Sequence, residues 1–322
     1  MANVHIRFSR FSAFYTPLLL TMSGGHLERE GLSGSWDITS PERPVDGGIA
    51  DGSVQVAQSA TAVSFEPYGL GTPLTFRHFA VMNLRDGFFL ARRGGTEPFD
   101  WSHLEGHSIV ADHYFQPMAL LRCALTERGV DISKVTFIDA GDPASMENAF
   151  RSGTGDYLHM QGPAPQQLED DGIATVVASV GEASWPIAFS TLVAHPNWLA
   201  TAEGQGFGRA FAAARHHAQT GAPSELARLV AEFLPAAGLP ALERTIATYQ
   251  GIGMWTGDLA ISPELYAHTV KLFRTFDGLA DHFLPDVYDP PRFALKLAHK
   301  DVSLATQVGK ELGVPMRLAN LT

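Results

Sequence analysis

The chain has 322 residues, of which 45% are hydrophobic and 18% are charged, a composition typical of a globular protein with room for two domains. Its 34 acidic and 23 basic side chains give a formal net charge of −11, which disfavours binding to nucleic acid or to an anionic membrane surface. Cys123 is the only cysteine, so an intramolecular disulfide and a thiolate metal cluster are excluded. We expect Cys123 to be buried on an apolar helix face.

The N-terminal segment includes Leu18-Leu19-Leu20, but polar and aromatic residues precede this apolar run and no small-residue cleavage motif follows it. The segment therefore lacks the pattern of an export signal. Nothing in the chain approaches the roughly 18 to 20 consecutive apolar residues of a membrane-spanning helix. We expect the protein in the periplasm if a leader precedes this sequence and is removed, and in the cytoplasm otherwise.

The first part of the chain alternates strands with polar loops. Val4–Phe8 has the alternation of a half-buried strand, and a helix begins after it near Pro17. Ser53–Ala57 is a further strand, and Phe76–Met82 and Phe88–Ala91 follow it. The loops after the first and second of these strands carry the polar and aromatic side chains that are candidates for ligand contact.

The segment from Gly106 to Gly162 has the order strand, polar turn, helix, strand, helix, strand. A β-α-β-α-β unit buries its strands on both faces, which predicts a parallel sheet whose loops meet at the carboxyl ends of the strands. Ligands bind at that rim in open α/β sheets. The turn Asp112–Gln116 and the residue Gln161 are therefore expected at one rim.

A later apolar run, Ala188–Ala194, should return the chain to the first half, and helices at 205–218, 224–234 and 239–249 should cover it. The expected fold is thus α/β with two lobes, each a mostly parallel sheet flanked by helices, joined by a hinge of two crossings. We expect lobe 1 to comprise residues 1–92 and 188–289, lobe 2 residues 93–187, and an appended helical tail residues 290–322.

Seven short motifs occur in an order that resembles the type II periplasmic substrate-binding proteins of ABC importers. The resemblance covers residues 4–288 and is to the branch that binds thiamine-pyrimidine precursors, sulfonates or taurine. It implies a small-molecule ligand, an ABC permease as partner and no cofactor. The motifs are Tyr15-Thr16-Pro17, Leu27–Leu32, Gly47–Val54, Leu104–Val110, Arg128–Asp131, Phe150–Asp156 and Val193–Leu199.

The C-terminal tail departs from that pattern. Phe293–Ala305 and Glu311–Met316 resemble the last helical segment of 3-hydroxyisobutyrate-type dehydrogenases, in which a lysine matching Lys300 lies near the nicotinamide cofactor. Those enzymes need a phosphate-binding glycine loop after their first strand, which this chain lacks. The glycine run Gly204–Gly208 follows no predicted strand. We interpret residues 290–322 as an appended helix that could form a dimer contact, and the oligomeric state stays open.

Candidate site residues come from the strand-end loops. Tyr15 could stack on a ligand or pack under the first helix, and Ser59 and Thr61 could bind an anion near a helix N-terminus or act as simple caps. Trp185 could cover the cleft or pack at the hinge. The full set of predicted ligand contacts is Tyr15, Ser59, Thr61, His113, Tyr114, Gln116, Gln161 and Trp185.

The leading interpretation is a non-enzymatic solute-binding protein that closes two lobes on an aromatic, heterocyclic or anionic ligand. The alternative is a cytoplasmic enzyme on the same fold, a decarboxylase or pyrimidine-synthase-like protein, because Asp112 and His113 could form an acid–base couple. No catalytic or metal-binding motif supports a catalytic residue or a metal ligand. The neighbouring residues His216 and His217 point about 100° apart on a helix, so we do not expect them to bind one metal ion.

Overall fold

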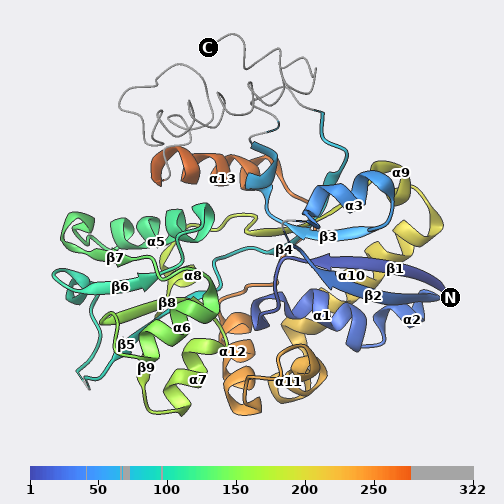
Figure 1. Cartoon of the computed structure of the whole chain (residues 1–322). Coiled ribbons are helices and arrows are strands. Elements are labelled where there is room, and N and C mark those ends of the chain that lie inside the picture. The colour runs from blue at the N-terminus through green and yellow to red at the C-terminus, as the bar shows by residue number, and fades with distance from the viewer. Residues whose placement is uncertain (41, 66, 68–72, 96, 277–322) are drawn as a thin grey trace, which may run out of the picture. The chain divides into compact units, whose positions relative to one another are not determined.

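The structure is a computed structural model, and it describes residues 1–276 except 41, 66, 68–72 and 96. Within them the chain forms two five-stranded sheets flanked by helices (Figure 1). The first sheet has the order β2-β1-β3-β10-β4, and the second has the order β7-β6-β8-β5-β9. The predicted α/β fold with two sheets is confirmed.

In the first sheet β1 pairs in parallel with β2 and β3, whereas β10 is antiparallel to β3 and β4. In the second, β6 pairs in parallel with β7 and β8, whereas β5 is antiparallel to β8 and β9. Each sheet is therefore mixed. The strands are β1 (Ala2–Phe8), β2 (Leu32–Ile38), β3 (Val56–Ser59), β4 (Arg77–Asn83), β5 (Phe88–Arg93), β6 (Ser108–Ala111), β7 (Thr136–Ile138), β8 (Tyr157–Gln161), β9 (Ala174–Ser179) and β10 (Ser190–Ala194).

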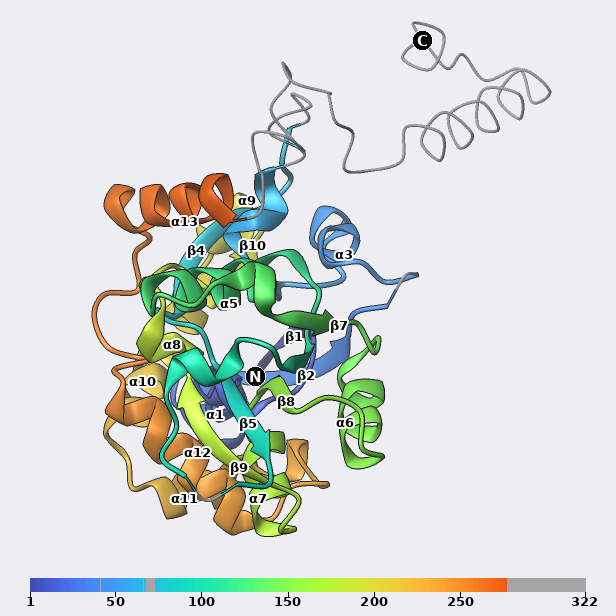
Figure 2. The same ribbon diagram turned by 90° about the vertical axis from the view of Figure 1, so that its left-hand side faces the viewer.

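Helices cover both sheets. Two helices from the last part of the described chain pack against helices that flank the second sheet. Helix α12 contacts α7, and α13 contacts α5, so that α5 and α13 lie side by side in both views (Figure 1 and Figure 2). The helices are α1 (Thr16–Ser23), α2 (His26–Arg29), α3 (Val45–Asp51), α5 (Phe115–Glu127), α6 (Pro143–Arg151), α7 (Ala164–Asp170), α8 (Val180–Ala183), α9 (Pro196–Leu199), α10 (Ala202–Thr220), α11 (Pro223–Val230), α12 (Leu239–Gly251) and α13 (Pro263–Phe276).

Local sequence explains where the helices begin. Asp142 caps α6 by accepting a hydrogen bond from the Ser145 N–H at 2.8 Å, and Pro143 follows at the first helical position, where its missing N–H has no helical partner. Thr201 caps α10 by accepting from the Gly204 N–H at 3.1 Å. No helix in the described part of the chain is long and apolar enough to cross a membrane.

Two chain crossings connect the sheets, as predicted. One runs from β4 to β5, and the other leads from α8 into β10. They are held side by side, since the Ile187 N–H donates to the Leu84 carbonyl and the Phe189 N–H to the Asn83 carbonyl, each at 3.0 Å. The lobe boundaries themselves stay a prediction, but β5, which the prediction places almost entirely in lobe 1, pairs within the second sheet. The predicted tail, residues 290–322, lies outside the described residues.

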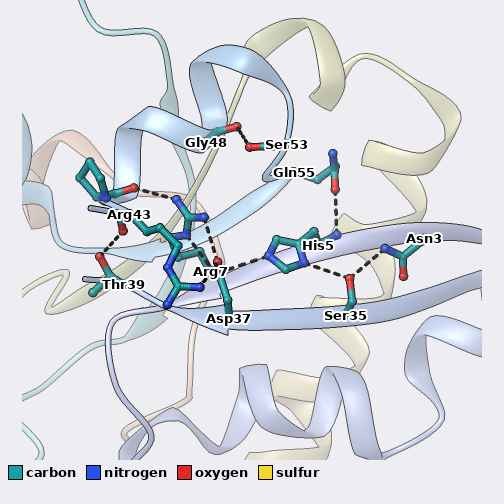
Figure 3. Close-up of polar contacts among 11 residues, drawn as sticks. Asn3, His5, Arg7, Ser35, Asp37, Thr39, Arg43, Gly48, Ser53 and Gln55 are labelled. Carbon is teal, nitrogen blue, oxygen red and sulfur yellow. Dashed lines mark hydrogen bonds and ion pairs between the residues drawn. The ribbon is translucent and has the colours of Figure 1, made fainter. Parts of the chain in front are cut away.

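A buried ion pair fixes the register of β1 against β2 (Figure 3). Arg7 is 6% exposed, and its Nε and Nη2 groups donate to the two carboxylate oxygens of Asp37, each at 2.9 Å. Its Nη1 donates to the Pro44 carbonyl at 2.9 Å, which holds the segment that leads into α3. The Arg7 guanidinium lowers the pKa of Asp37. Arg7 and Asp37 are direct partners on the neighbouring strands β1 and β2, so this network stabilises the pairing of these strands.

Cys123 lies on the buried face of α5, as predicted. Burial raises the pKa of its thiol to about 11, so the reactive thiolate is scarce at neutral pH.

Candidate ligand-binding site

The loops at the carboxyl ends of β1, β6 and β8 meet around a small cleft of about 100 Å³. Its lining comes from the loop after β1, from β5 and β8 of the second sheet, from the residues after β6 and β8, and from the first turns of α6 and α7. This is the rim at which the sequence predicted ligand binding. The lining residues are Arg10, Phe11, Ser12, Phe88, Asp112, Pro143, Met146, Met160, Gln161, Gly162, Pro163 and Ala164.

Arg10, two residues beyond the end of β1, is the one basic residue among these lining residues. Its side chain is 31% exposed, and its Nη1 lies 3.4 Å from Oδ2 of Asp112, a long contact for a charge-assisted hydrogen bond. The guanidinium carbon lies 5.7 Å from the ring centre of Tyr114. A guanidinium has five N–H donors, so most of them are available to a ligand in the cleft.

Direct hydrogen bonds connect the segments on the two sides of the cleft. The Ser12 hydroxyl, after β1, donates to the Gly162 carbonyl at 2.8 Å, and Gln161 Nε2 donates to the Tyr15 hydroxyl at 3.3 Å. The Tyr249 hydroxyl of α12 accepts from the Gly162 N–H at 3.1 Å and donates to the Gly87 carbonyl at 2.6 Å. The structure therefore brings together Tyr15 and Gln161, which the sequence placed in separate lobes.

Helix N-termini gather at the same place. Pro143 and Ala164, the first residues of α6 and α7, both line the cleft, and α5 begins directly after Tyr114. The N-terminal end of a helix carries a partial positive charge and unpaired N–H groups, which suit an anion. Asp142 already caps α6 and Pro165 lacks an N–H in the first turn of α7, so Arg10 is the group that favours a negatively charged ligand in the cleft.

The three residues predicted as a set, His113, Tyr114 and Gln116, do not line the cleft. Gln116 is 6% exposed, and its Nε2 donates to the Phe189 carbonyl at 2.7 Å, so it ties α5 to a crossing between the sheets. His113 Nδ1 lies 2.7 Å from the Ala111 carbonyl oxygen. Tyr114 is 64% exposed, and the guanidinium of Arg10 lies over its ring. Their ligand contacts stay predictions.

The remaining predicted residues lie away from the cleft lining. Ser59 and Thr61 are buried at the end of β3, and the short 3₁₀ helix Thr61–Ser64 has no side-chain cap, so the structure does not support the capping interpretation. Trp185 donates from Nε1 to Glu127 Oε1 at 3.0 Å, and its ring lies 4.4 Å from Lys271 Nζ. Trp185 thus contacts α5 and α13, and its role at the cleft or the hinge stays a prediction.

Sequence reasoning missed Arg10, Ser12 and Gly162. A signal for Arg10 was present, because it is a charged residue two positions past a strand whose carboxyl end was expected at the binding rim. Ser12 and Gly162 carry no such signal, since their role depends on the contact between them.

Two buried histidines, His26 and His159, and the half-buried His78 are held neutral by the fold. His159, in β8 next to the cleft, is fully buried, and its ring stacks on Phe88 with centres 4.5 Å apart. Burial, together with the nearby His113, lowers the pKa of His159 to about 3. Burial also lowers the pKa of His26 and of His78 to about 4.

These shifts predict a loss of stability in mild acid. Between about pH 6.5 and pH 4 the unfolded chain takes up protons at the three histidines while the folded chain does not, so these groups lower the free energy of unfolding as the pH falls. Buried Asp86, whose pKa is raised by burial, offsets part of this fall. His159→Phe keeps the ring stack and should reduce the pH dependence by about one proton. Urea titrations at pH 7, 6 and 5 measure it, with His216→Gln at an exposed position of α10 as the control. A His159→Phe protein with the pH dependence of the wild type would contradict this prediction.

No family model matches the chain. The curated protein YtlA of Bacillus subtilis (strain 168), named as an inferred binding protein, is 30% identical over 203 residues, which are 62% of this chain and 60% of that relative. The chain thus aligns with less than two thirds of the relative's length.

Solved structures give a wider match. The alkanesulfonate-binding protein SsuA from Xanthomonas axonopodis pv. citri, bound to MOPS, superposes with a TM-score of 0.60 at 16% identity, over 89% of this chain and 95% of SsuA. The periplasmic nitrate-binding protein NrtA from Synechocystis PCC 6803 superposes with a TM-score of 0.60 at 12% identity, over 76% of this chain and 70% of NrtA. The chain therefore has the two-lobed α/β fold of periplasmic substrate-binding proteins.

Proposed function

We propose that this protein binds a small oxyanionic solute, such as a sulfonate, in the cleft between its two sheets and delivers it to an ABC permease. The observation that carries the proposal is Arg10. It lies in a cleft between hydrogen-bonded halves, beside the N-termini of α6 and α7. The SsuA and NrtA structures support the choice of ligand, because both of those proteins are named for the oxyanions that they bind. Delivery to a permease places the working protein in the periplasm.

The choice of an anion over a neutral heterocycle follows from the balance of charge in the cleft. Asp112 is 3% exposed, and one of its carboxylate oxygens already accepts from the Tyr114 N–H at 2.9 Å. Arg10 has only the 3.4 Å contact to Asp112 among the hydrogen bonds of the described residues. An oxyanion that accepts from the Arg10 guanidinium uses the donors that this side chain leaves available.

The structure does not support the acid–base couple that favoured the enzymatic alternative. Asp112 contacts Arg10 and the Tyr114 N–H, whereas His113 contacts the Ala111 carbonyl and lies 4.0 Å from Asp139. The two side chains therefore have different partners and do not form an acid–base couple in this structure.

A ligand panel tests the proposal. Isothermal titration calorimetry should show binding of methanesulfonate or nitrate that weakens as chloride is added, because charge attraction contributes to the affinity. Dimethyl sulfone, a neutral compound of similar size, should not bind detectably. Binding of an aminopyrimidine such as thiamine, with no heat from any of the oxyanions, would contradict the proposal and favour the thiamine-precursor interpretation.

A further inference from the structure

A second, larger cavity adjoins the cleft. It has a volume of about 420 Å³ and shares Phe11, Pro163 and Ala164 with the cleft lining. We call it the apolar groove and define it by Phe11, Phe233 and Leu234 on one wall and by Arg151 and Gln167 on the other. Three residues thus border both spaces, so the groove lies directly next to the proposed anion site.

The apolar wall is a preformed aromatic cluster. The Phe11 ring contacts Trp36 edge-to-face with centres 4.9 Å apart, and it contacts Phe233 in the same way at 5.4 Å. Trp36 contacts Phe233 at 6.2 Å, so the three rings hold one another. Phe233 is 8% exposed and Trp36 is 45% exposed. These ring contacts hold Phe11 and Phe233, which line the groove, in place before a ligand binds.

The opposite wall is polar, but its charges are paired. Arg151 donates from Nε to Glu147 at 2.8 Å, and its Nη2 lies 2.8 Å from a carboxylate oxygen of Asp171. Gln167 donates to Asp171 at 3.0 Å. A second charged group on the ligand would have to displace these ion pairs. The groove therefore favours an uncharged group.

We propose that the ligand is an arylsulfonate or a similar aryl oxyanion, with its charged head at Arg10 and one or two fused rings in the apolar groove. This inference rests on the proposed function and narrows its substrate class. The size agrees, because a cavity of about 150 Å³ in another protein holds one benzene molecule, and the groove alone measures about 420 Å³. Pockets of roughly 300–1,000 Å³ are typical of small-molecule sites.

The test compares two ligands that share a head group. In calorimetry, 2-naphthalenesulfonate should bind the wild-type protein at least about tenfold more tightly than methanesulfonate, because it buries an apolar ring system in the groove. Ala236→Trp fills the groove from an exposed position. This variant should lose about tenfold or more in affinity for 2-naphthalenesulfonate and less than about twofold for methanesulfonate.

Leu239→Trp is the matched control, since Leu239 is 45% exposed and does not line the groove. It should change neither affinity. Equal affinities of the wild type for the two sulfonates would overturn the aryl inference and leave the oxyanion function standing. Failure of both sulfonates to bind would overturn the proposed function itself. The wild-type comparison decides the inference even if Ala236→Trp folds poorly.

Discussion

Arg10→Gln should weaken methanesulfonate binding by about 10- to 100-fold, because it removes charge-assisted hydrogen bonds that contribute roughly 1.5–3 kcal/mol. Arg10 is partly exposed, and its carboxylate contact is 3.4 Å long, so the melting temperature should change little. The affinity is measured by calorimetry. The control is Arg209→Gln, which removes an exposed arginine that pairs with Glu30 at 2.7 Å.

The partner of Arg10 provides a second, opposite test of the same interaction. Asp112→Asn removes a negative charge next to the proposed anion and releases the Arg10 guanidinium, so it should strengthen anion binding severalfold. An affinity that is unchanged in Arg10→Gln, or that falls in Asp112→Asn, would show that the anion does not bind beside this pair.

Two glycines of α10 should respond to alanine with opposite signs. A Cβ atom at Gly204 would lie 2.2 Å from the Trp198 carbonyl oxygen and 2.8 Å from the Leu199 Cα. These are backbone atoms of the preceding turn, which cannot move aside as a flexible side chain can. Gly204→Ala should therefore lower the free energy of unfolding by about 2–3 kcal/mol.

The matched variant lies one turn further along the same helix. A Cβ at Gly208 would have no atom within 4 Å, so Gly208→Ala should raise the free energy of unfolding by about 0.5–1 kcal/mol through helix propensity alone. Urea denaturation measures both changes. Equal effects of the two substitutions would contradict the packing explanation of this glycine run, which lies within a helix and follows no strand.

Much of the fold follows from sequence periodicity. The alternation in Val4–Phe8 and the apolar spacing after Pro117 predict a strand and a helix, and the structure contains both as β1 and α5. The sheet to which β5 belongs could not be predicted in this way. Phe88–Arg93 has the same pattern in either lobe, and its place is set by its pairing with β8 and β9, which is a tertiary property.

The sequence predicted which edge of the sheet holds the candidate site. It did not predict which side chains point into that site. The carboxyl ends of parallel strands locate the binding edge, and Gln161 was found there by that argument. Gln116 shares a loop and helix start with exposed Tyr114, yet it is buried and bonded to Phe189. Sequence gives the polarity of such residues, whereas the direction of each side chain depends on the packing of distant segments.

A crystal structure with 4-bromobenzenesulfonate would test the central claim most directly, because the bromine gives an anomalous signal that fixes the orientation of the ligand. We predict sulfonate oxygens within hydrogen-bonding distance of the Arg10 guanidinium, in the cleft between the loop that follows β1 and Gln161. Sulfonate density away from this cleft, with the cleft empty, would contradict the account.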